Sequence, residues 1–262
     1  MNTKAEKVSS YNPSQVGLSG SLFGLPFNFD ESEVVILPVP WDVTVSYGYG
    51  THMAPDAILE ASSQVDLYDF DNPDGWKSGM FMLDVSEPVL SQNKHFRGHA
   101  KEIIKVLEKG GKISEFPVLT ENLSAVNQAC EEMNAWVFEQ TLTLLNREKI
   151  VGLLGGDHST PLGFLKALST LYPEFGILQI DAHADLRDSY EGFEYSHASI
   201  MFNALKIPQI QKLVQVGVRD IGHEEMMRID QSDGRIVSFF DSFIKEQLYL
   251  GKTWNDICDR IS

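Results

Sequence analysis

Two carboxylates and one imidazole alternate in the segment Asp181-Ala182-His183-Ala184-Asp185. An apolar run at 175–180 precedes it and predicts a buried strand. In an extended backbone, residues i, i+2 and i+4 lie on one face, so the three groups would lie side by side where the strand ends. Crowded carboxylates repel each other unless a cation lies between them. Carboxylate and imidazole ligands without a thiolate suit Mn²⁺, Zn²⁺ or Fe²⁺. The alternative is a polar loop whose acids cap the next helix.

A second polar segment, Gly155-Gly156-Asp157-His158-Ser159, follows another apolar run at 150–154. The two glycines permit a sharp turn and a close backbone approach. The alternative interpretation is a glycine turn in which the aspartate or the serine caps a helix. Because functional groups gather beyond the carboxyl ends of parallel strands, two such ends carrying His and Asp favour a shared metal site.

The elements that must position these groups are strands alternating with helices. Helical spacing of apolar residues is typical of the segments at about 96–109 and 122–146. Alternation of this kind predicts an α/β fold, a three-layer sandwich with a mostly parallel central sheet. Residues 1–30 are predicted to form an irregular arm, and residues 31–262 a single domain. The predicted strands are 34–37, 80–83, 150–154, 177–180, 213–218 and 236–240.

Composition limits the partners of the chain. Its 37 acidic and 21 basic residues give a formal charge of −16, which argues against nucleic acid or an anionic membrane and favours a cationic ligand. No run approaches the roughly 18 apolar residues of a membrane span. The polar N-terminus lacks a signal-peptide core. Cys130 and Cys258 lack metal-ligand spacing, so we expect free thiols and a cytoplasmic location.

In these motifs the chain resembles the ureohydrolases, the family of arginase, agmatinase and their relatives. Their two metal motifs resemble residues 155–159 and 181–187, and a further motif resembles 195–199. Residues 48–58 and 216–219 are also similar to family segments, so the resemblance covers about residues 33 to 262. It is closer to agmatinases, because arginases carry an asparagine and a serine in the region where this chain has Arg187.

The resemblance implies a site for two divalent ions, with Mn²⁺ expected and Ni²⁺ as an alternative, that hold a bridging hydroxide. His158 would bind one ion and His183 the other. Asp181 would bridge the two ions, and Asp185 would bind a metal and accept a hydrogen bond from the hydroxide. His197 would carry a proton to the departing amine or contact the substrate. The alternative interpretation of His197 is a solvent-facing histidine at the start of a helix.

The implied reaction is hydrolysis of a guanidino compound to urea and an amine, with agmatine expected as the substrate. The alternatives are 4-guanidinobutyrate, arginine, guanidine, or a non-catalytic chain that acts through assembly. Family members form oligomers, so a homo-oligomer is expected. The substrate-binding residues are not identified. Tyr190, Glu191 and Tyr195 are candidates for substrate contact, and the alternative is that they lie in a solvated loop. His52, which follows the glycine-rich loop, is another candidate.

One family feature is absent from the sequence. The third metal motif, which supplies two more aspartates, is only partly similar to Ser238-Phe239-Phe240-Asp241 and would be due just after Ser262. Residues 254–261 have the spacing of an amphipathic helix without a stop signal. We therefore predict a C-terminally truncated domain with missing strands and an apolar edge strand. In this form the 262-residue chain is expected to hold metal weakly, which puts its own activity in doubt.

Overall fold

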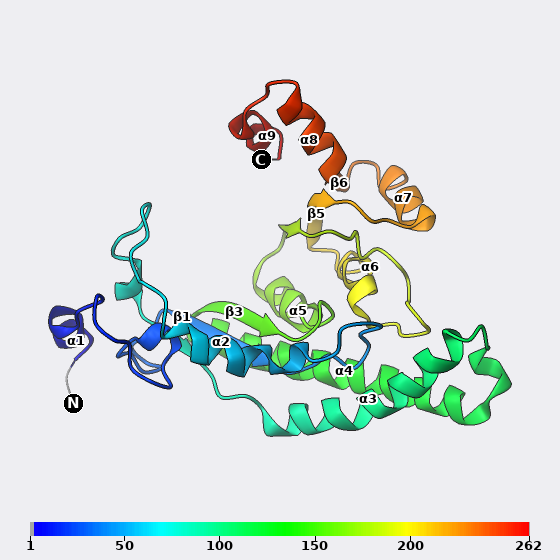
Figure 1. Cartoon of the computed structure of the whole chain (residues 1–262), viewed down its shortest axis with the longest axis horizontal. Coiled ribbons are helices and arrows are strands. Elements are labelled where there is room, and N and C mark those ends of the chain that lie inside the picture. The colour runs from blue at the N-terminus through cyan, green and yellow to red at the C-terminus, as the bar shows by residue number, and fades with distance from the viewer. Residues whose placement is uncertain (1–2, 262) are drawn as a thin grey trace. The chain divides into compact units, whose positions relative to one another are not determined.

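The computed structural model describes residues 3–261. The chain divides into two compact units, Met1–Ala167 (unit 1) and Leu168–Ser262 (unit 2), and each is treated by itself. Figure 1 follows the elements from blue to red along the chain. The α/β class is confirmed: all strand pairings among the described residues are parallel. The strands form two three-stranded sheets, where the sequence predicted one central sheet.

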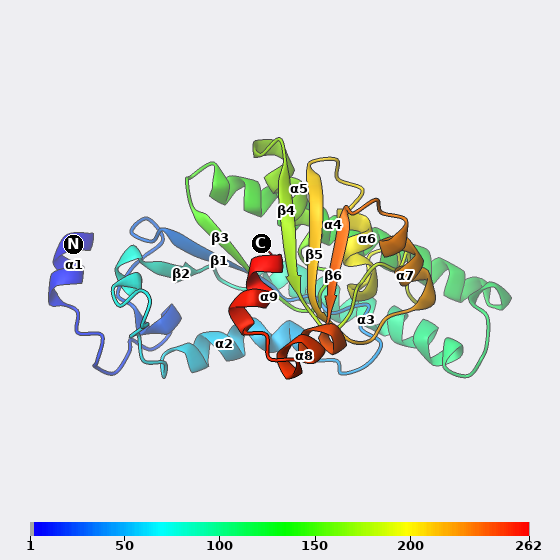
Figure 2. The same cartoon turned by 90° about the horizontal axis from the view of Figure 1, so that it is seen from above.

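Unit 1 contains sheet A, in the order β2-β1-β3. Its strands are β1 (Val34–Val39), β2 (Met80–Met82) and β3 (Ile150–Gly155), and Figure 2 shows them together. Val34 of β1 pairs with Met80 on one side and Ile150 on the other. β1 is the central strand of sheet A. Its residues Val35 and Leu37 to Val39 are buried, as expected for an apolar strand inside a parallel sheet.

The helices of unit 1 bury apolar faces against the sheet and one another. They are α2 (Ala54–Ser62), α3 (Glu87–Leu107), α4 (Pro117–Leu145) and α5 (Leu162–Leu171), which crosses the boundary between the units. α4 contacts α3, β1 and β3. Val126, Cys130 and Val137 of α4 are completely buried, at the helical spacing expected. Burial raises the pKa of the Cys130 thiol, so it is protonated and unreactive at neutral pH.

The N-terminal segment is more ordered than predicted. It contains the helix α1 (Lys4–Ser10), which begins at a capping box formed by Thr3 and Glu6. After the short 3-10 helix η1 (Leu22–Gly24), Leu25 and Phe27 bury their side chains against Trp76. The other 3-10 helices of unit 1 are η2 (Thr51–Met53), η3 (Gly75–Ser78) and η4 (Ile113–Glu115).

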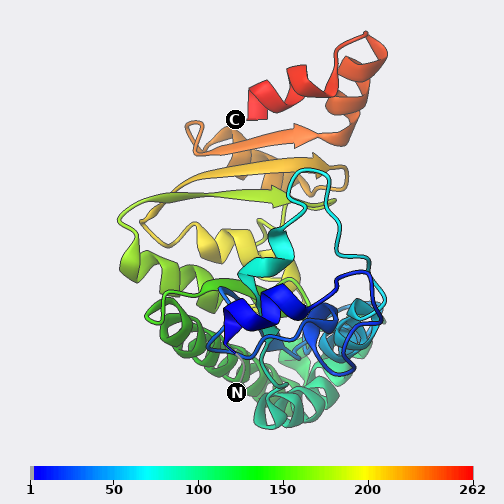
Figure 3. The same cartoon turned by 90° about the vertical axis from the view of Figure 1, so that its left-hand side faces the viewer.

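Unit 2 contains sheet B, in the order β4-β5-β6. Its strands are β4 (Phe175–Ile180), β5 (Ile210–Val218) and β6 (Ile236–Phe240). They are followed or connected by η5 (His197–Ser199), α6 (Ile200–Ala204), α7 (His223–Asp230), α8 (Asp241–Tyr249) and α9 (Trp254–Ile261). Ile244 of α8 and Ile257 of α9 pack with Val216 and Phe239 of the sheet, and Figure 3 shows both helices beside it.

Strand β4 is an edge strand of sheet B. Its side chains Leu178 and Ile180 are 59% and 80% exposed. Together with Trp254 and Cys258 of α9, they line a cavity of about 460 Å³ in unit 2. The predicted strands beyond Ser262 stay a prediction. No helix within residues 3–261 is long and apolar enough to cross a bilayer.

Candidate metal centre

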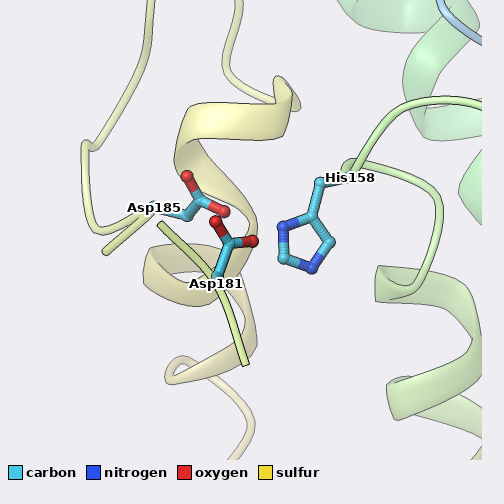
Figure 4. Close-up of side chains that lie close together, drawn as sticks. All are labelled: His158, Asp181 and Asp185. Carbon is cyan, nitrogen blue, oxygen red and sulfur yellow. The ribbon is translucent and has the colours of Figure 1, made fainter. Parts of the chain in front are cut away.

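Asp181 and Asp185 come together directly after β4. A carboxylate oxygen of each lies within 4.8 Å of one from the other, with Asp185 buried and Asp181 half-buried. Figure 4 shows the two carboxylates close together. The N–H of Asp181 donates to the carbonyl of Val216 (3.1 Å), which continues the pairing of β4 with β5. Two close carboxylates are stabilised by a cation between them. This part of the predicted constellation is present in unit 2.

His183 does not join the two aspartates, in contrast to the prediction from an extended backbone. The chain leaves the strand after Ile180, and Asp185 has a φ of 54°. Short polar residues such as aspartate tolerate this left-handed region. The His183 side chain is 59% exposed, with Nδ1 3.6 Å from Asp181 Oδ1 and Nε2 3.9 Å from Asp220 Oδ2. Its predicted role as a ligand of a second metal stays a prediction.

Asp220 is a neighbour that the sequence reasoning missed. It forms a parallel bridge with His183 and is 84% exposed. The N–H groups of Arg219 (2.8 Å) and Asp220 (3.2 Å) both donate to the carbonyl of Ala182. The available signal was its place directly after the end of β5, because neighbouring parallel strands end at the same edge.

A buried amide network lies beneath the Asp181–Asp185 loop and was also missed. Gln179 of β4 and Gln215 of β5 are 4% and 0% exposed, although their strands are otherwise mainly apolar. Gln179 Nε2 lies 3.4 Å from Asp185 Oδ2 and 3.3 Å from the carbonyl oxygen of His183. Gln215 Nε2 donates to the carbonyl of Ala184 (2.7 Å). A lone glutamine in an apolar strand was the signal, since a buried amide needs partners.

The loop that follows is held by Glu225 of α7. Glu225 accepts hydrogen bonds from the N–H groups of Leu186 (3.0 Å) and Gly222 (2.8 Å). Its carboxylate also lies 3.7 Å from Arg187 Nε, and the Arg187 guanidinium lies 4.9 Å from the centre of the Tyr190 ring. A buried acid anchors the segment immediately after Asp185, so Arg187 has a fixed place although it is partly exposed.

His197 stands at the start of η5, half-buried behind the Tyr190 ring. The two ring centres are 5.9 Å apart in an edge-on arrangement. Its Nδ1 is buried and has no hydrogen-bond partner among residues 3–261. Its Nδ1 therefore does not face solvent, and the predicted role of His197 stays a prediction. An imidazole nitrogen without a partner is suited to exchange a proton or bind a ligand.

In unit 1, the Gly155–Ser159 loop is packed against the segment after β1. A Cβ on Gly156 would lie 1.8 Å from the carbonyl oxygen of Trp41, so only glycine fits there. The N–H of Asp157 donates to that same oxygen (2.8 Å), and the Asp157 carboxylate accepts the N–H of Ser159 (2.8 Å). Asp157 therefore caps the turn. His158, also labelled in Figure 4, is half-buried at the end of β3.

His52 is bound to a buried acid, Asp42, at the carboxyl end of β1. Asp42 Oδ2 lies 2.9 Å from His52 Nδ1 and accepts the N–H groups of His52 (3.1 Å) and Gly50 (3.0 Å). Asn93 Nδ2 donates to Asp42 Oδ1 (3.1 Å). Burial alone would raise the pKa of Asp42, but these hydrogen bonds outweigh it and the pKa lies below its ordinary value. The pair organises the glycine-rich loop. Its predicted contact with substrate stays a prediction.

The donor chemistry of these loops fits an ion of the Mn²⁺ class. Asp181 and Asp185 offer carboxylate oxygens within 4.8 Å of each other, which suit a hard divalent cation. Imidazole nitrogens from His158 or His183 extend the choice to borderline ions. Cys130 does not offer a thiolate, because its thiol is buried and burial raises its pKa.

Comparisons with known proteins find related ureohydrolases. The chain is 30% identical over 199 residues to an N(1)-aminopropylagmatine ureohydrolase of Thermus thermophilus, covering 76% of this chain and 55% of that protein. An agmatinase of Halalkalibacterium halodurans is 25% identical over 214 residues, covering 82% of this chain and 61% of the agmatinase. The chain thus spans little more than half the length of these relatives.

Solved structures share the fold. The agmatine ureohydrolase of Thermoplasma volcanium matches with a TM-score of 0.60 at 21% identity, covering 98% of this chain and 71% of that one. A proclavaminate amidino hydrolase of Streptomyces clavuligerus matches with a TM-score of 0.58 at 16% identity, covering 91% and 68%. The family model described as the arginase family matches residues 32–247, which is most of the sequence. The chain therefore belongs to the arginase family.

Proposed function

We propose that this chain carries the metal-binding part of a hydrolase that converts a guanidino compound to urea and an amine. The observation that carries the proposal is the pair of carboxylates of Asp181 and Asp185, held within 4.8 Å of each other by one loop. The names of the relatives, ureohydrolases and agmatinases, support the same reaction. The presence of His158, Asp181, His183 and Asp185 together in the sequence also supports catalysis.

The proposed ligands are His158, Asp181, His183 and Asp185, for two divalent ions of which Mn²⁺ is the first choice. When bound, such ions would lower the pKa of a water molecule so that hydroxide is present at neutral pH. Asp185 would also accept a hydrogen bond from the attacking oxygen. Its buried place in the loop fixes the orientation of that carboxylate, and the Gln179 amide lies against it.

His197 is the proposed proton carrier for the departing amine. Its buried Nδ1 without a partner and its place behind Tyr190 support this role. The His197→Asn variant is expected to lower kcat by about 100- to 10,000-fold, the usual contribution of a general acid or base. Mn²⁺ affinity, measured by titration calorimetry, should stay unchanged. His99→Asn on the partly exposed side of α3 is the matched control. An unchanged kcat would contradict the proposal.

The proposed substrate is a cation with a guanidinium group. Agmatine remains the first choice, and the names of three relatives add N(1)-aminopropylagmatine. The charge of −16 favours encounter with such cations. The deciding region is the loop from Arg187 to Tyr195, where Glu225 and Tyr190 hold Arg187 in place.

The experiment measures urea release by the 262-residue chain. Agmatine, N(1)-aminopropylagmatine, arginine, 4-guanidinobutyrate and guanidine are each supplied with Mn²⁺, with Ni²⁺ or with EDTA. We expect urea only with metal and from one of the first two compounds, with weaker release from the 262-residue chain, which is expected to hold metal weakly, than from a longer form. A longer natural form, if one is encoded, is assayed in parallel. Absence of urea from every form and every compound would refute the proposed function.

A second candidate function is assembly without catalysis. It is favoured by the exposed apolar side chains Leu178 and Ile180 on the edge strand β4. Such an edge invites pairing with another chain. Sedimentation of the chain, with and without Mn²⁺, separates the two functions when combined with the urea assay. A homo-oligomer in the cytoplasm is the expectation under either function.

A further inference from the structure

We propose that Ser238, Gln215 and Gln179 form a one-directional hydrogen-bond chain that positions Asp185 for metal binding. The inference rests on the proposed role of Asp185 as a metal ligand. The three residues come from the three adjacent strands of sheet B, and none has a place in the proposed ligand set. They act through Asp185, so they are positioning residues.

The chain runs across the sheet in one direction. Ser238 Oγ of β6 donates to Gln215 Oε1 of β5 at 2.7 Å. Gln215 Nε2 donates to Gln179 Oε1 of β4 at 2.6 Å. Gln179 Nε2 then donates to Asp185 Oδ2 at 3.4 Å. Each donor points toward the loop, so the last N–H group meets the Asp185 carboxylate.

Backbone carbonyls fix the direction. The second N–H of Gln215 meets the carbonyl of Ala184 (2.7 Å), and the second N–H of Gln179 meets that of His183 (3.3 Å). Turning either amide over would place its oxygen against a carbonyl oxygen and leave two acceptors facing each other. The network therefore also ties down the backbone on both sides of Ala184.

Burial makes the network effective. Gln215 is 0% exposed and Gln179 is 4% exposed, so their amides are strongly polarised and any lost partner is costly. A hydrogen bond to an ionised carboxylate is stronger than one between neutral groups. The Gln179 N–H therefore fixes how the Asp185 carboxylate is rotated. Partners of this kind typically change metal affinity by about 10- to 100-fold.

The test measures the Mn²⁺ dissociation constant of the 262-residue chain by titration calorimetry. Gln179→Leu removes the donor and is expected to raise the dissociation constant at least about tenfold. Gln215→Glu removes the donor to Gln179 Oε1, so that the Gln179 amide turns its oxygen toward Asp185. The same weakening is expected although residue 215 does not touch the aspartate. The control is Gln211→Glu, an exposed position of the same strand, which should bind like the wild type.

A purely structural role is separated by the metal-free chain. In EDTA, the thermal unfolding midpoints of the Gln179→Leu and Gln215→Glu variants should not fall far enough to explain their lower Mn²⁺ affinity. The electron paramagnetic resonance spectrum of bound Mn²⁺ should change in both variants. Gln179→Glu preserves the size of the side chain and is used in place of Gln179→Leu if leucine prevents folding. It is expected to weaken Mn²⁺ binding at least as much as Gln179→Leu does. Rescue by Gln179→His, which restores a donor, would support the chain of donors.

Three outcomes would overturn the inference. If Gln179→Leu binds Mn²⁺ with wild-type affinity while Asp185→Asn has lost the metal, this inference is refuted and the proposed function stands. If Gln179→Leu weakens Mn²⁺ binding and Gln215→Glu does not, the directional hydrogen-bond chain is refuted. Wild-type affinity in Asp185→Asn, or no Mn²⁺ binding by the wild type, removes the proposed ligand and this inference with it.

Discussion

Replacing Asp185 by asparagine is expected to lower the affinity for Mn²⁺ by about 100-fold or more, since the change removes a charged ligand and partners of ligands already contribute about 10- to 100-fold. Asparagine has nearly the same volume, so the buried site should stay packed. The metal-free chain should therefore unfold at nearly the wild-type temperature. Urea release at limiting Mn²⁺ should fall with the affinity, and excess metal should restore only part of it.

The measurement is titration calorimetry with Mn²⁺, paired with the urea assay. Asp188→Asn is the matched control. Asp188 lies in the same loop, but its side chain is exposed, and its Oδ2 lies 3.8 Å from a guanidinium nitrogen of Arg228. Equal affinities for Asp185→Asn and Asp188→Asn would contradict a ligand role for Asp185. Removal of metal by EDTA should abolish urea release in the wild type, and added Mn²⁺ should restore it.

The strands were predictable from the sequence because each is a short apolar run. β1, the central strand of sheet A, is apolar on both faces, as a strand inside a parallel sheet must be. The observed bounds of β1, β3 and β5 differ from the predicted ones by no more than a few residues. The carboxyl ends of such strands gather polar groups. The sequence also predicted that Asp181 and Asp185 lie close together, although it did so from an extended backbone that the loop does not have.

The loop geometry was not predictable because distant contacts decide it. An extended backbone would align His183 with both aspartates, but the chain turns at Asp185. That turn depends on hydrogen bonds to the Asp185 carbonyl from Met201 (3.0 Å) and Phe202 (3.3 Å). Local sequence carries no sign of partners that lie far along the chain.

The supporting polar residues were missed for a related reason. Gln179 and Gln215 each stand in an apolar strand, and only the register of β4 and β5 brings them opposite one another. Asp42 stands ten positions from His52 without a motif that links them. A sequence shows which side chains can bind a metal more readily than it shows which side chains hold those ligands in place.

Replacing Asp42 by alanine is expected to destabilise unit 1 by about 3 kcal/mol, a typical cost when one partner of a buried charged network is lost. The change leaves His52 Nδ1, the His52 N–H and the Gly50 N–H without their shared acceptor. Unfolding in urea, followed by tryptophan fluorescence, measures the loss. Asp30→Ala, which removes an exposed ion pair with Arg147, should cost less than about 1 kcal/mol.

The pH dependence of this variant provides an independent check. Because the folded-state pKa of Asp42 is lowered, its contribution to stability is fully present above the unfolded-state value, about 3.9, and is lost as the pH falls through the folded-state value. The difference in unfolding free energy between the wild type and Asp42→Ala should therefore be largest near neutral pH and shrink below about pH 4. A difference that stays constant down to the acid transition would show that Asp42 contributes through packing and not through its charge. Since Trp41 contacts Gly156 and Asp157 directly, loss of the Asp42 anchor should also loosen the loop that carries His158.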